Sequence, residues 1–283
     1  MKSELKLACA DFSFPLLSHE NSLKLIGMLG VEGVDIGFFQ DRSHLQPNDV
    51  LKNPEKFAGE LRTQLEVNNL LIADLFLQTA ADFVSTAINH TDRKVREGTR
   101  DTFLRTLDFG KMAGTDHITI LPGVIFQEES RESSYRRACD ELAWRIEKSA
   151  DAGIVLSVEG HIGSFCETPE ALEELVEDVK DLTLTLDYTH FTKIGYKDEA
   201  IENLLPYASH FHARAACLNR AQTSFSNNTI DYARVVKEMV RTDYSGYIGL
   251  EYVWIDWEHM NEVDNLSEII QLRDYLNTNI REM

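Results

Sequence analysis

The sequence predicts an α/β protein that folds as a single-domain (β/α)8 or TIM barrel over residues 1–283. Eight short apolar runs rich in strand-forming residues alternate with longer segments of helical periodicity, which is the pattern of parallel βα units. Successive runs are separated by about 35 residues on average, close to the spacing of barrel strands. No Ser/Pro-rich linker, charge block or low-complexity stretch divides the chain.

The eight predicted strands are short apolar runs rich in strand-forming residues. They are Leu5–Ala10, Gly33–Phe38, Leu70–Leu77, His117–Leu121, Ile154–Glu159, Leu182–Asp187, His210–Ala213 and Tyr247–Glu251. The alternative fold is an open, doubly wound sheet. That fold is disfavoured because neither a GxGxxG turn after the first strand nor a GxxxxGK[ST] loop is found.

The segments between the strands carry residues that typically begin and end helices. Helix starts are expected at Asn53-Pro54, Thr91-Asp92, Thr168-Pro169 and Asp231. Gly114, Gly153 and Gly246 lie between a helix and the next strand, where a left-handed residue commonly ends the helix.

The acidic composition excludes some classes of partner. Asp and Glu number 47 against 28 Lys and Arg, a net charge of −19, so binding to nucleic acid is not expected because it relies on basic side chains. The four cysteines form no CxxC pair and are expected to be reduced thiols. The start of the chain lacks an apolar signal core, and no apolar run is long enough for a membrane span, so a cytoplasmic protein without a membrane partner is expected.

Candidate metal ligands follow from the geometry of a barrel, in which the carboxyl ends of all strands line one mouth. Glu159, Asp187 and Glu251 end three of the predicted strands, and His212 lies in the strand between the last two. Three carboxylates around one point would repel each other unless a cation neutralised them. Oxygen ligands with one imidazole suit a hard to borderline divalent ion, and we expect Mn²⁺, with Mg²⁺, Co²⁺, Fe²⁺ or Zn²⁺ as alternatives.

These segments also carry a family resemblance that spans all eight units. Val158-Glu159-Gly160-His161, Leu186-Asp187-Tyr188-Thr189-His190, His210-Phe211-His212 and Leu250-Glu251-Tyr252 resemble the xylose isomerase-like TIM barrel family of sugar isomerases and epimerases. The resemblance implies that Glu159, Asp187, His212 and Glu251 hold the metal. It also implies that Glu159 and Glu251 exchange protons with the substrate, and that His190 binds a substrate oxygen.

The sequence departs from the ketose epimerases of that family at two positions. Phe165 stands where they have a further glutamate, and Leu218 where they have an arginine. We expect His161 and Arg214 to bind substrate instead, because His161 follows Glu159 closely and Arg214 shares a strand face with His212. Arg220 is a weaker candidate for the same task. Trp254 and Trp257 follow the last ligand and are candidates for packing against a sugar ring.

The predicted function is that of a metal-dependent isomerase or epimerase in carbohydrate metabolism. It would move a proton α to the carbonyl of a small polyhydroxylated carbohydrate or keto-acid through an enediolate. The first alternative is a metal-dependent dehydratase of a keto-sugar or keto-cyclitol, which shares the first proton abstraction. The second alternative is a non-catalytic carbohydrate-binding protein. A homodimer or homotetramer is the expected assembly, by analogy with the family.

Overall fold

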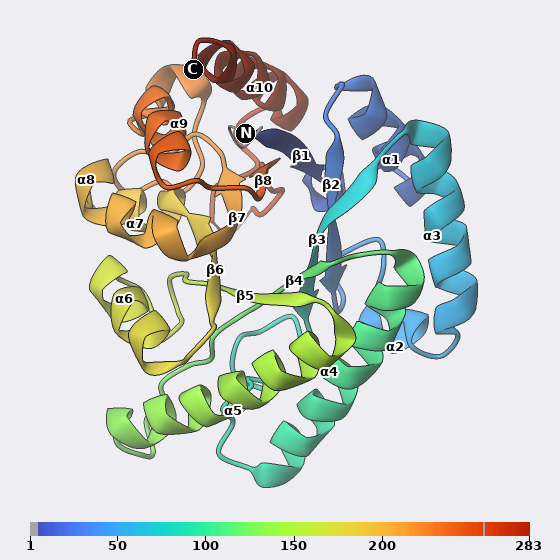
Figure 1. The fold of residues 1–283 in the computed structure, drawn as a ribbon, viewed down its shortest axis with the longest axis vertical. Coiled ribbons are helices and arrows are strands. Elements are labelled where there is room, and N and C mark those ends of the chain that lie inside the picture. The colour runs from blue at the N-terminus through green and yellow to red at the C-terminus, as the bar shows by residue number, and fades with distance from the viewer. Residues whose placement is uncertain (1–4, 257) are drawn as a thin grey trace.

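The computed structural model describes residues 5–256 and 258–283, and in it eight parallel strands form a closed barrel (Figure 1). Each strand pairs with the next along the chain, and β8 closes the barrel on β1. The strands are β1 Lys6–Ala10, β2 Gly33–Phe39, β3 Leu71–Gln78, β4 His117–Ile120, β5 Val155–Glu159, β6 Thr183–Asp187, β7 Ala208–Ala213 and β8 Tyr247–Leu250. The predicted barrel and its eight strands are therefore confirmed, with every boundary within two residues of the expected one.

Helices surround the barrel (Figure 1). They are α1 His19–Met28, α2 Pro47–Val50, α3 Pro54–Asn68, α4 Arg93–Ala113, α5 Arg131–Ala152, α6 Pro169–Asp178, α7 Tyr188–Lys193, α8 Asp198–Ile201, α9 Tyr232–Arg241 and α10 Asn265–Arg281. Short 3-10 turns lie at η1 Asp11–Ser13, η2 Glu202–Tyr207 and η3 Phe225–Asn227. In the described part of the chain, no helix is both long enough and apolar enough to cross a membrane.

The expected helix starts are all found. Asp92, Thr168 and Asp231 each cap a helix with a side-chain oxygen that accepts a backbone N–H, and Pro54 is the first residue of α3. Gly114 and Gly153 end α4 and α5 with φ of 95° and 73°. The same expectation for Gly246 was wrong, because α9 ends at Arg241 with Thr242 as its C-cap, and the left-handed residue that follows is Asp243, with φ of 54°.

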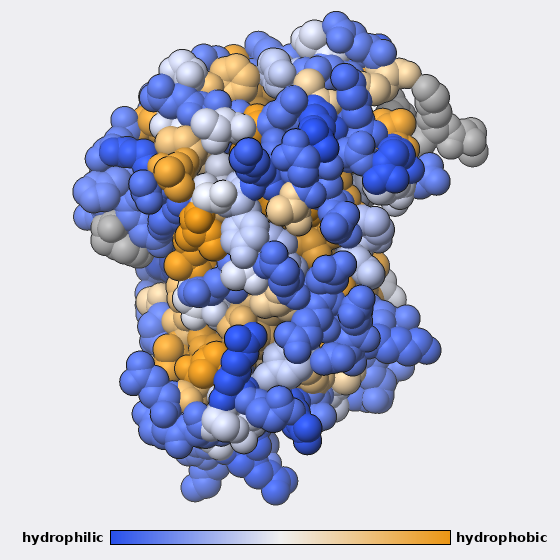
Figure 2. All heavy atoms as spheres, turned by 90° about the vertical axis from the view of Figure 1, so that its left-hand side faces the viewer, coloured by the Kyte–Doolittle hydropathy of each residue, from blue (hydrophilic) through white to orange (hydrophobic). Residues whose placement is uncertain are grey.

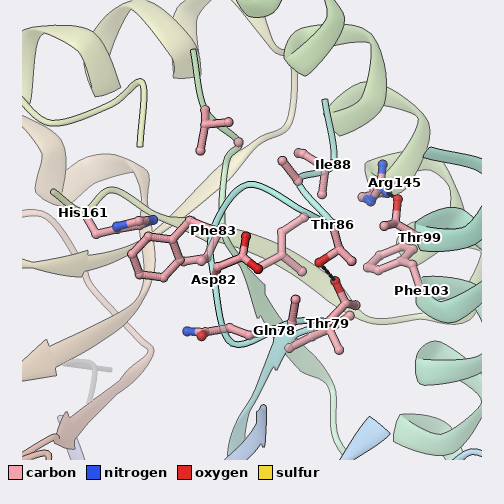
Figure 3. Close-up of a pocket in the computed structure, with 17 residues that line it drawn as sticks. Gln78, Thr79, Asp82, Phe83, Thr86, Ile88, Thr99, Phe103, Arg145 and His161 are labelled. Carbon is pink, nitrogen blue, oxygen red and sulfur yellow. Dashed lines mark hydrogen bonds between the residues drawn. The ribbon is translucent and has the colours of Figure 1, made fainter. Parts of the chain in front are cut away.

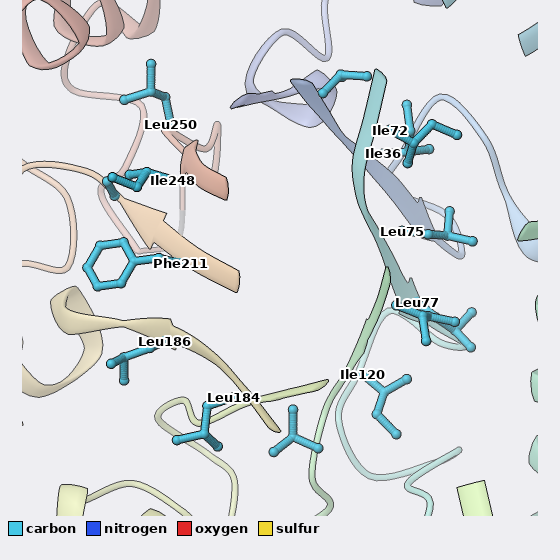
Figure 4. Close-up of a cluster of buried hydrophobic side chains, with 14 of the residues drawn as sticks. Ile36, Ile72, Leu75, Leu77, Ile120, Leu184, Leu186, Phe211, Ile248 and Leu250 are labelled. Carbon is cyan, nitrogen blue, oxygen red and sulfur yellow. The ribbon is translucent and has the colours of Figure 1, made fainter. Parts of the chain in front are cut away.

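The apolar core lies between the barrel and the helices. Alternate strand residues point away from the barrel axis, as Figure 4 shows for Leu184, Leu186, Phe211 and Ile248, and these side chains are at most 1% exposed. The opposite side of the helices meets solvent. Figure 2 shows the face that α6–α9 form, which is mostly hydrophilic with small apolar patches, as the amphipathic sequence pattern requires.

The residues that point into the barrel are unusually polar. His117 Nδ1 lies 2.6 Å from Asp74 Oδ1, and His117 Nε2 lies 2.8 Å from Ser209 Oγ. Closer to the mouth, His210 Nε2 lies 3.2 Å from Asp35 Oδ1. The interior is therefore filled by a polar layer that supports the mouth from below.

Gly249 on β8 makes room for this layer. A methyl group there would collide with Asp35 Oδ2 and approach His210 Nε2 to 3.1 Å. We predict that Gly249→Ala lowers the free energy of unfolding by about 1–3 kcal/mol, the usual cost of overpacking a dense interior. Urea denaturation measures the change. Gly59→Ala on α3 is the matched control, since nothing lies within 4 Å of its added methyl group; equal stabilities of the two variants would refute the close approach.

Candidate metal centre and its cavity

Four neighbouring strands bring the candidate ligands together. Glu159 and Asp187 are the last residues of β5 and β6, His212 lies next to the end of β7, and Glu251 directly follows β8. The register of the barrel pairs Asp187 with His212. All four residues are buried, with 5% exposure or less. Their convergence comes from the strand order, since they are far apart along the chain.

Two overlapping groups of ligand atoms result. His212 Nδ1 lies 2.7 Å from Glu159 Oε1 and 3.6 Å from Glu251 Oε2. The potential ligand atoms of Glu159, His212 and Glu251 all lie within 4.8 Å of one another, and the same holds for Glu159, Asp187 and His190. Glu159 belongs to both groups, so the five side chains form one continuous cluster.

Arg214 on the same face as His212 is part of this cluster. Its Nη2 lies 2.9 Å from Asp187 Oδ2, its Nη1 pairs with Glu251 Oε2, and its Nε donates to the carbonyl oxygen of Ala221 at 3.0 Å. Although burial opposes the charge, the carboxylates of Asp187 and Glu251 raise the pKa of Arg214 above its usual range. The Arg214 guanidinium therefore neutralises part of the negative charge of the carboxylates. From the sequence alone, we expected a metal ion to neutralise all of it.

The donor set fits a divalent cation in addition to Arg214. Asp187 Oδ2 is buried, and its neighbours among the described residues, Arg214 Nη2 at 2.9 Å and His190 Nε2 at 3.5 Å, are not aligned with it as hydrogen-bond donors. A buried carboxylate oxygen with an ion pair but no aligned donor is only partly satisfied, and a metal cation is one way to complete its coordination. Three carboxylates and one imidazole are ligands that Mn²⁺, Mg²⁺, Fe²⁺ or Zn²⁺ accept.

Burial also changes the acid–base behaviour of the cluster. It raises the pKa of Glu251 above that of an ordinary carboxyl group, and the nearby charge of Glu159 acts in the same direction, while Arg214 and His212 oppose the shift. The pKa of His212 is also raised: burial works against it, but the Glu251 and Glu159 carboxylates favour its protonated form more strongly. A carboxylate of raised basicity beside a cavity is suited to accept a proton from carbon.

A cavity of about 480 Å³ opens above the cluster. Glu159, His161, His190, Arg214 and Glu251 line it, whereas Asp187 and His212 lie beneath its floor. The rings of His161 and His190 are 6.1 Å apart between centroids. Figure 3 shows the adjoining smaller pocket, where His161 lies against Phe83 from the loop between β3 and α4.

Other residues singled out from the sequence have different positions. Arg220 lies outside this cavity and pairs with Glu262 on the surface. Trp254 does line the cavity and is 45% exposed, whereas Trp257 lies outside the described residues. Phe165 and Leu218, at which the sequence departs from the ketose epimerases, do not line the cavity either. Phe165 packs edge-on against Tyr135, and Leu218 is 62% exposed.

Part of the cavity wall was not anticipated from the sequence. Phe12, Phe39 and Phe76 form an aromatic wall in which neighbouring ring centroids are 4.9 and 5.1 Å apart, and Phe76 reaches to 5.9 Å from His212. Arg42, Gln78, Lys193 and Glu258 supply the remaining charged and polar lining. Phe39 and Gln78 are the last residues of β2 and β3, so the rule applied to the later strands would have found them. No comparable position at a strand end identifies Arg42, Lys193 and Glu258 from the sequence.

Comparison with known proteins agrees with this geometry. The profile of the xylose isomerase-like TIM barrel family matches residues 23–276. Comparison of the sequence with curated proteins gives no match.

Three solved structures are similar over nearly the whole chain. An L-ribulose 3-epimerase superimposes with a TM-score of 0.78 at 14% identity, covering 98% of this chain and 95% of its own. The probable 3-DHS dehydratase AsbF from Bacillus anthracis superimposes with a TM-score of 0.71 at 15% identity, covering 95% of this chain and 99% of its own. The IOLI protein with a bound zinc atom gives 0.74 at 16% identity over 98% of each. At these identities the likeness establishes the fold alone, and it is the profile match over most of the chain that assigns this protein to the xylose isomerase-like TIM barrel family.

Proposed function

We propose that the protein is a divalent-metal-dependent isomerase or epimerase that moves a proton α to a carbonyl of a small polyhydroxylated substrate. The observation that carries this proposal is the pair of glutamates at the cavity floor. Glu159 and Glu251 both line the cavity and both lie within 4 Å of the same His212 nitrogen. Two carboxylates in one cavity can remove a proton from a carbon and return one to it.

In this proposal Glu159, Asp187, His212 and Glu251 hold the ion, with Mn²⁺ as the expected metal. When bound, the ion supplies Lewis acidity that lowers the cost of forming an enediolate. Glu251 takes the proton from the α-carbon, and the C–H electron pair becomes part of the enediolate double bond. Glu159, which carries a proton at the start of this step, then donates it to the opposite face of that carbon, which inverts it. Alternatively it donates to the neighbouring carbon while the hydroxyl proton moves to the former carbonyl oxygen, which moves the carbonyl. Proton exchange with solvent afterwards deprotonates Glu251 and reprotonates Glu159.

His161, His190 and Arg214 are the proposed contacts for substrate oxygens. Burial lowers the pKa of His161 to about 4, and the charge of His190 contributes to the shift. Burial also lowers the pKa of His190. At neutral pH both rings are therefore uncharged. The Nδ1–H of His161 donates to the carbonyl oxygen of Ile162, which leaves Nε2 to accept from a substrate hydroxyl group, whereas His190 has one donor and one acceptor nitrogen.

Similar folds support this proposal and keep one alternative open. L-ribulose 3-epimerase and D-tagatose 3-epimerase-like proteins share the barrel, and so does a probable dehydratase. A dehydratase would begin with the same abstraction of an α-proton and then expel a hydroxyl group as water. The mass of the product separates the two, since an isomerase keeps every atom and a dehydratase loses water.

Deuterium exchange tests the proton transfer. Mn²⁺-loaded protein is incubated in D2O with a panel of ketoses, keto-acids and keto-cyclitols, and mass spectrometry follows deuterium at the α-carbon. We predict that Glu251→Gln and Glu159→Gln each slow exchange or conversion by about 10²–10⁴-fold, because each removes a general acid–base group. Glu66→Gln, on the exposed side of α3, is the matched control and should exchange like the wild type. Carbohydrate binding that survives in both variants, with no exchange in the wild type, would instead identify a binding protein.

Metal binding is tested without reference to activity. Calorimetric titration of chelator-treated protein with MnCl2 should give one ion per chain, and Asp187→Asn should weaken binding at least about tenfold, which corresponds to about 1.4 kcal/mol. Asp151→Asn on α5 makes the same change of charge at a side chain that is 70% exposed and should leave the affinity unchanged. Equal affinity of the two variants would remove Asp187 from the ligand set.

The depressed pKa of His161 predicts a pH-dependent stability. The folded-state pKa of about 4 lies below the ordinary value of 6.5, so between these values the unfolded chain binds the proton more tightly. The free energy of unfolding therefore decreases as pH falls from about 7.5 to 5, and protonation of His161 accounts for about 2 kcal/mol of this decrease. In urea unfolding of chelator-treated protein, the free energy of unfolding of His161→Gln should decrease less over this pH range than that of the wild type. His259→Gln, at a histidine with a side chain that is 72% exposed, should show the same decrease as the wild type, and identical pH profiles of the two variants would contradict the assignment.

A further inference from the structure

Arg42 is a charged side chain of the cavity wall that the proposed chemistry does not use. It follows β2 by three residues, is half-buried and lines the same cavity as Glu159 and Glu251. Its Nη2 donates to the amide oxygen of Gln78, and its guanidinium carbon lies 5.6 Å from the centre of the Phe39 ring. A neutral amide and an aromatic ring therefore fix the guanidinium at the mouth.

No carboxylate within residues 5–256 and 258–283 forms an ion pair with Arg42, and its Nε is buried without a hydrogen-bond acceptor. The other two cationic side chains of the cavity are paired, Arg214 with Asp187 and Glu251, and Lys193 with Glu258 at 3.3 Å. Glu258 acts on Arg42 electrostatically, but it lies beyond ion-pairing distance. Burial of an arginine without a counter-charge is costly, so the missing partner needs an explanation.

A shortage of acidic residues is not that explanation. The chain has 47 acidic against 28 basic residues, and it pairs its shielded arginines elsewhere, as Arg145 does with Glu141 and Arg137 with Glu129. The described arginines without an ion pair are Arg42, Arg62, Arg131 and Arg281, and all except Arg42 are exposed to solvent. Arg42 thus differs from the rest in being both shielded and unpaired.

We propose that Arg42 binds an anionic group of the substrate, a carboxylate or a phosphate, so that the substrate is a keto-acid, sugar acid or sugar phosphate. This inference rests on the proposed function, because it assigns a substrate class to the same cavity. The planar guanidinium presents parallel N–H groups that match two oxygens of such an anion. The aromatic wall of Phe12, Phe39 and Phe76 keeps water away from one side, which strengthens the attraction.

The charge of the whole cavity agrees with an anionic ligand. Three cationic side chains (Arg42, Lys193, Arg214) and three carboxylates (Glu159, Glu251, Glu258) line it, and Asp187 lies beneath. With a divalent ion in place, the cavity of this strongly acidic protein carries a net positive charge. Arg42 is the lining cation whose N–H groups are not already held by a carboxylate, so it is the one free to bind the substrate anion.

Binding of three matched three-carbon ketones tests the proposal. Dihydroxyacetone is neutral, hydroxypyruvate carries a carboxylate, and dihydroxyacetone phosphate carries a phosphate. Calorimetry on the Mn²⁺-loaded wild type should show at least one anion binding about tenfold more tightly than the neutral ketone. Arg42→Gln should abolish most of that preference and leave the neutral ketone unaffected. Arg62→Gln, an exposed arginine without an ion pair on α3, is the matched control and should behave like the wild type.

Each result has a defined meaning. The anion that loses affinity in Arg42→Gln identifies the group as carboxylate or phosphate. An unchanged preference in Arg42→Gln, equal binding of all three ketones to the wild type, or no anion binding at millimolar concentration would each overturn the proposal. The titrations are repeated on chelator-treated protein, where the effect of Arg42 should persist because it does not act through the metal. Arg42-dependent binding without any deuterium exchange would refute the proposed isomerase and leave this inference standing.

Discussion

The burial of three carboxylates at one end of the barrel is the constraint on which the rest of the site depends. Glu159, Asp187 and Glu251 are each at most 5% exposed, so water screens their charges only weakly. Arg214 supplies one fixed positive charge and His212 a second, conditional one, since its pKa is raised by the same carboxylates. The cluster is thus partly compensated before any metal is considered, and a divalent ion would complete the balance.

This balance extends into the barrel interior. His212 Nε2 faces Asp35 Oδ2 at 3.9 Å, and His210 lies between Asp35 and the deeper His117. Asp35 can approach these rings because Gly249 on β8 has no side chain. A polar layer below the mouth therefore restrains the imidazole of His212, leaving its Nδ1 directed toward Glu159 and Glu251. An apolar interior would leave that ring free to turn.

Sequence reasoning predicted the floor of the site and missed much of its wall, for a physical reason. Strand residues obey a period of two and strand ends converge at one mouth, so Glu159, Asp187 and Glu251 could be placed without coordinates. Loop residues obey no such rule, so the position of Arg42 over the cavity was not predictable. Arg214 was placed on the correct face, but its ion pairs with Asp187 and Glu251 depend on side-chain directions that spacing alone does not define. The prediction that Gly246 is the left-handed residue after a helix was wrong, because Asp243, which precedes it, takes that conformation.

The division between floor and wall also explains how one barrel can serve several reactions. The floor sits on β5–β8, where the strand register fixes each side chain to its neighbours. Much of the wall comes from the segments after β1, β2, β3 and β8, including Phe12, Arg42, Phe83 and Trp254. With the proposed function, a change in these loops would alter which substrate is held above the two glutamates without disturbing the charge balance beneath. If Arg42 binds a substrate anion as proposed, the wall is the place where an unpaired arginine can be accommodated, because there a substrate would supply the missing negative charge.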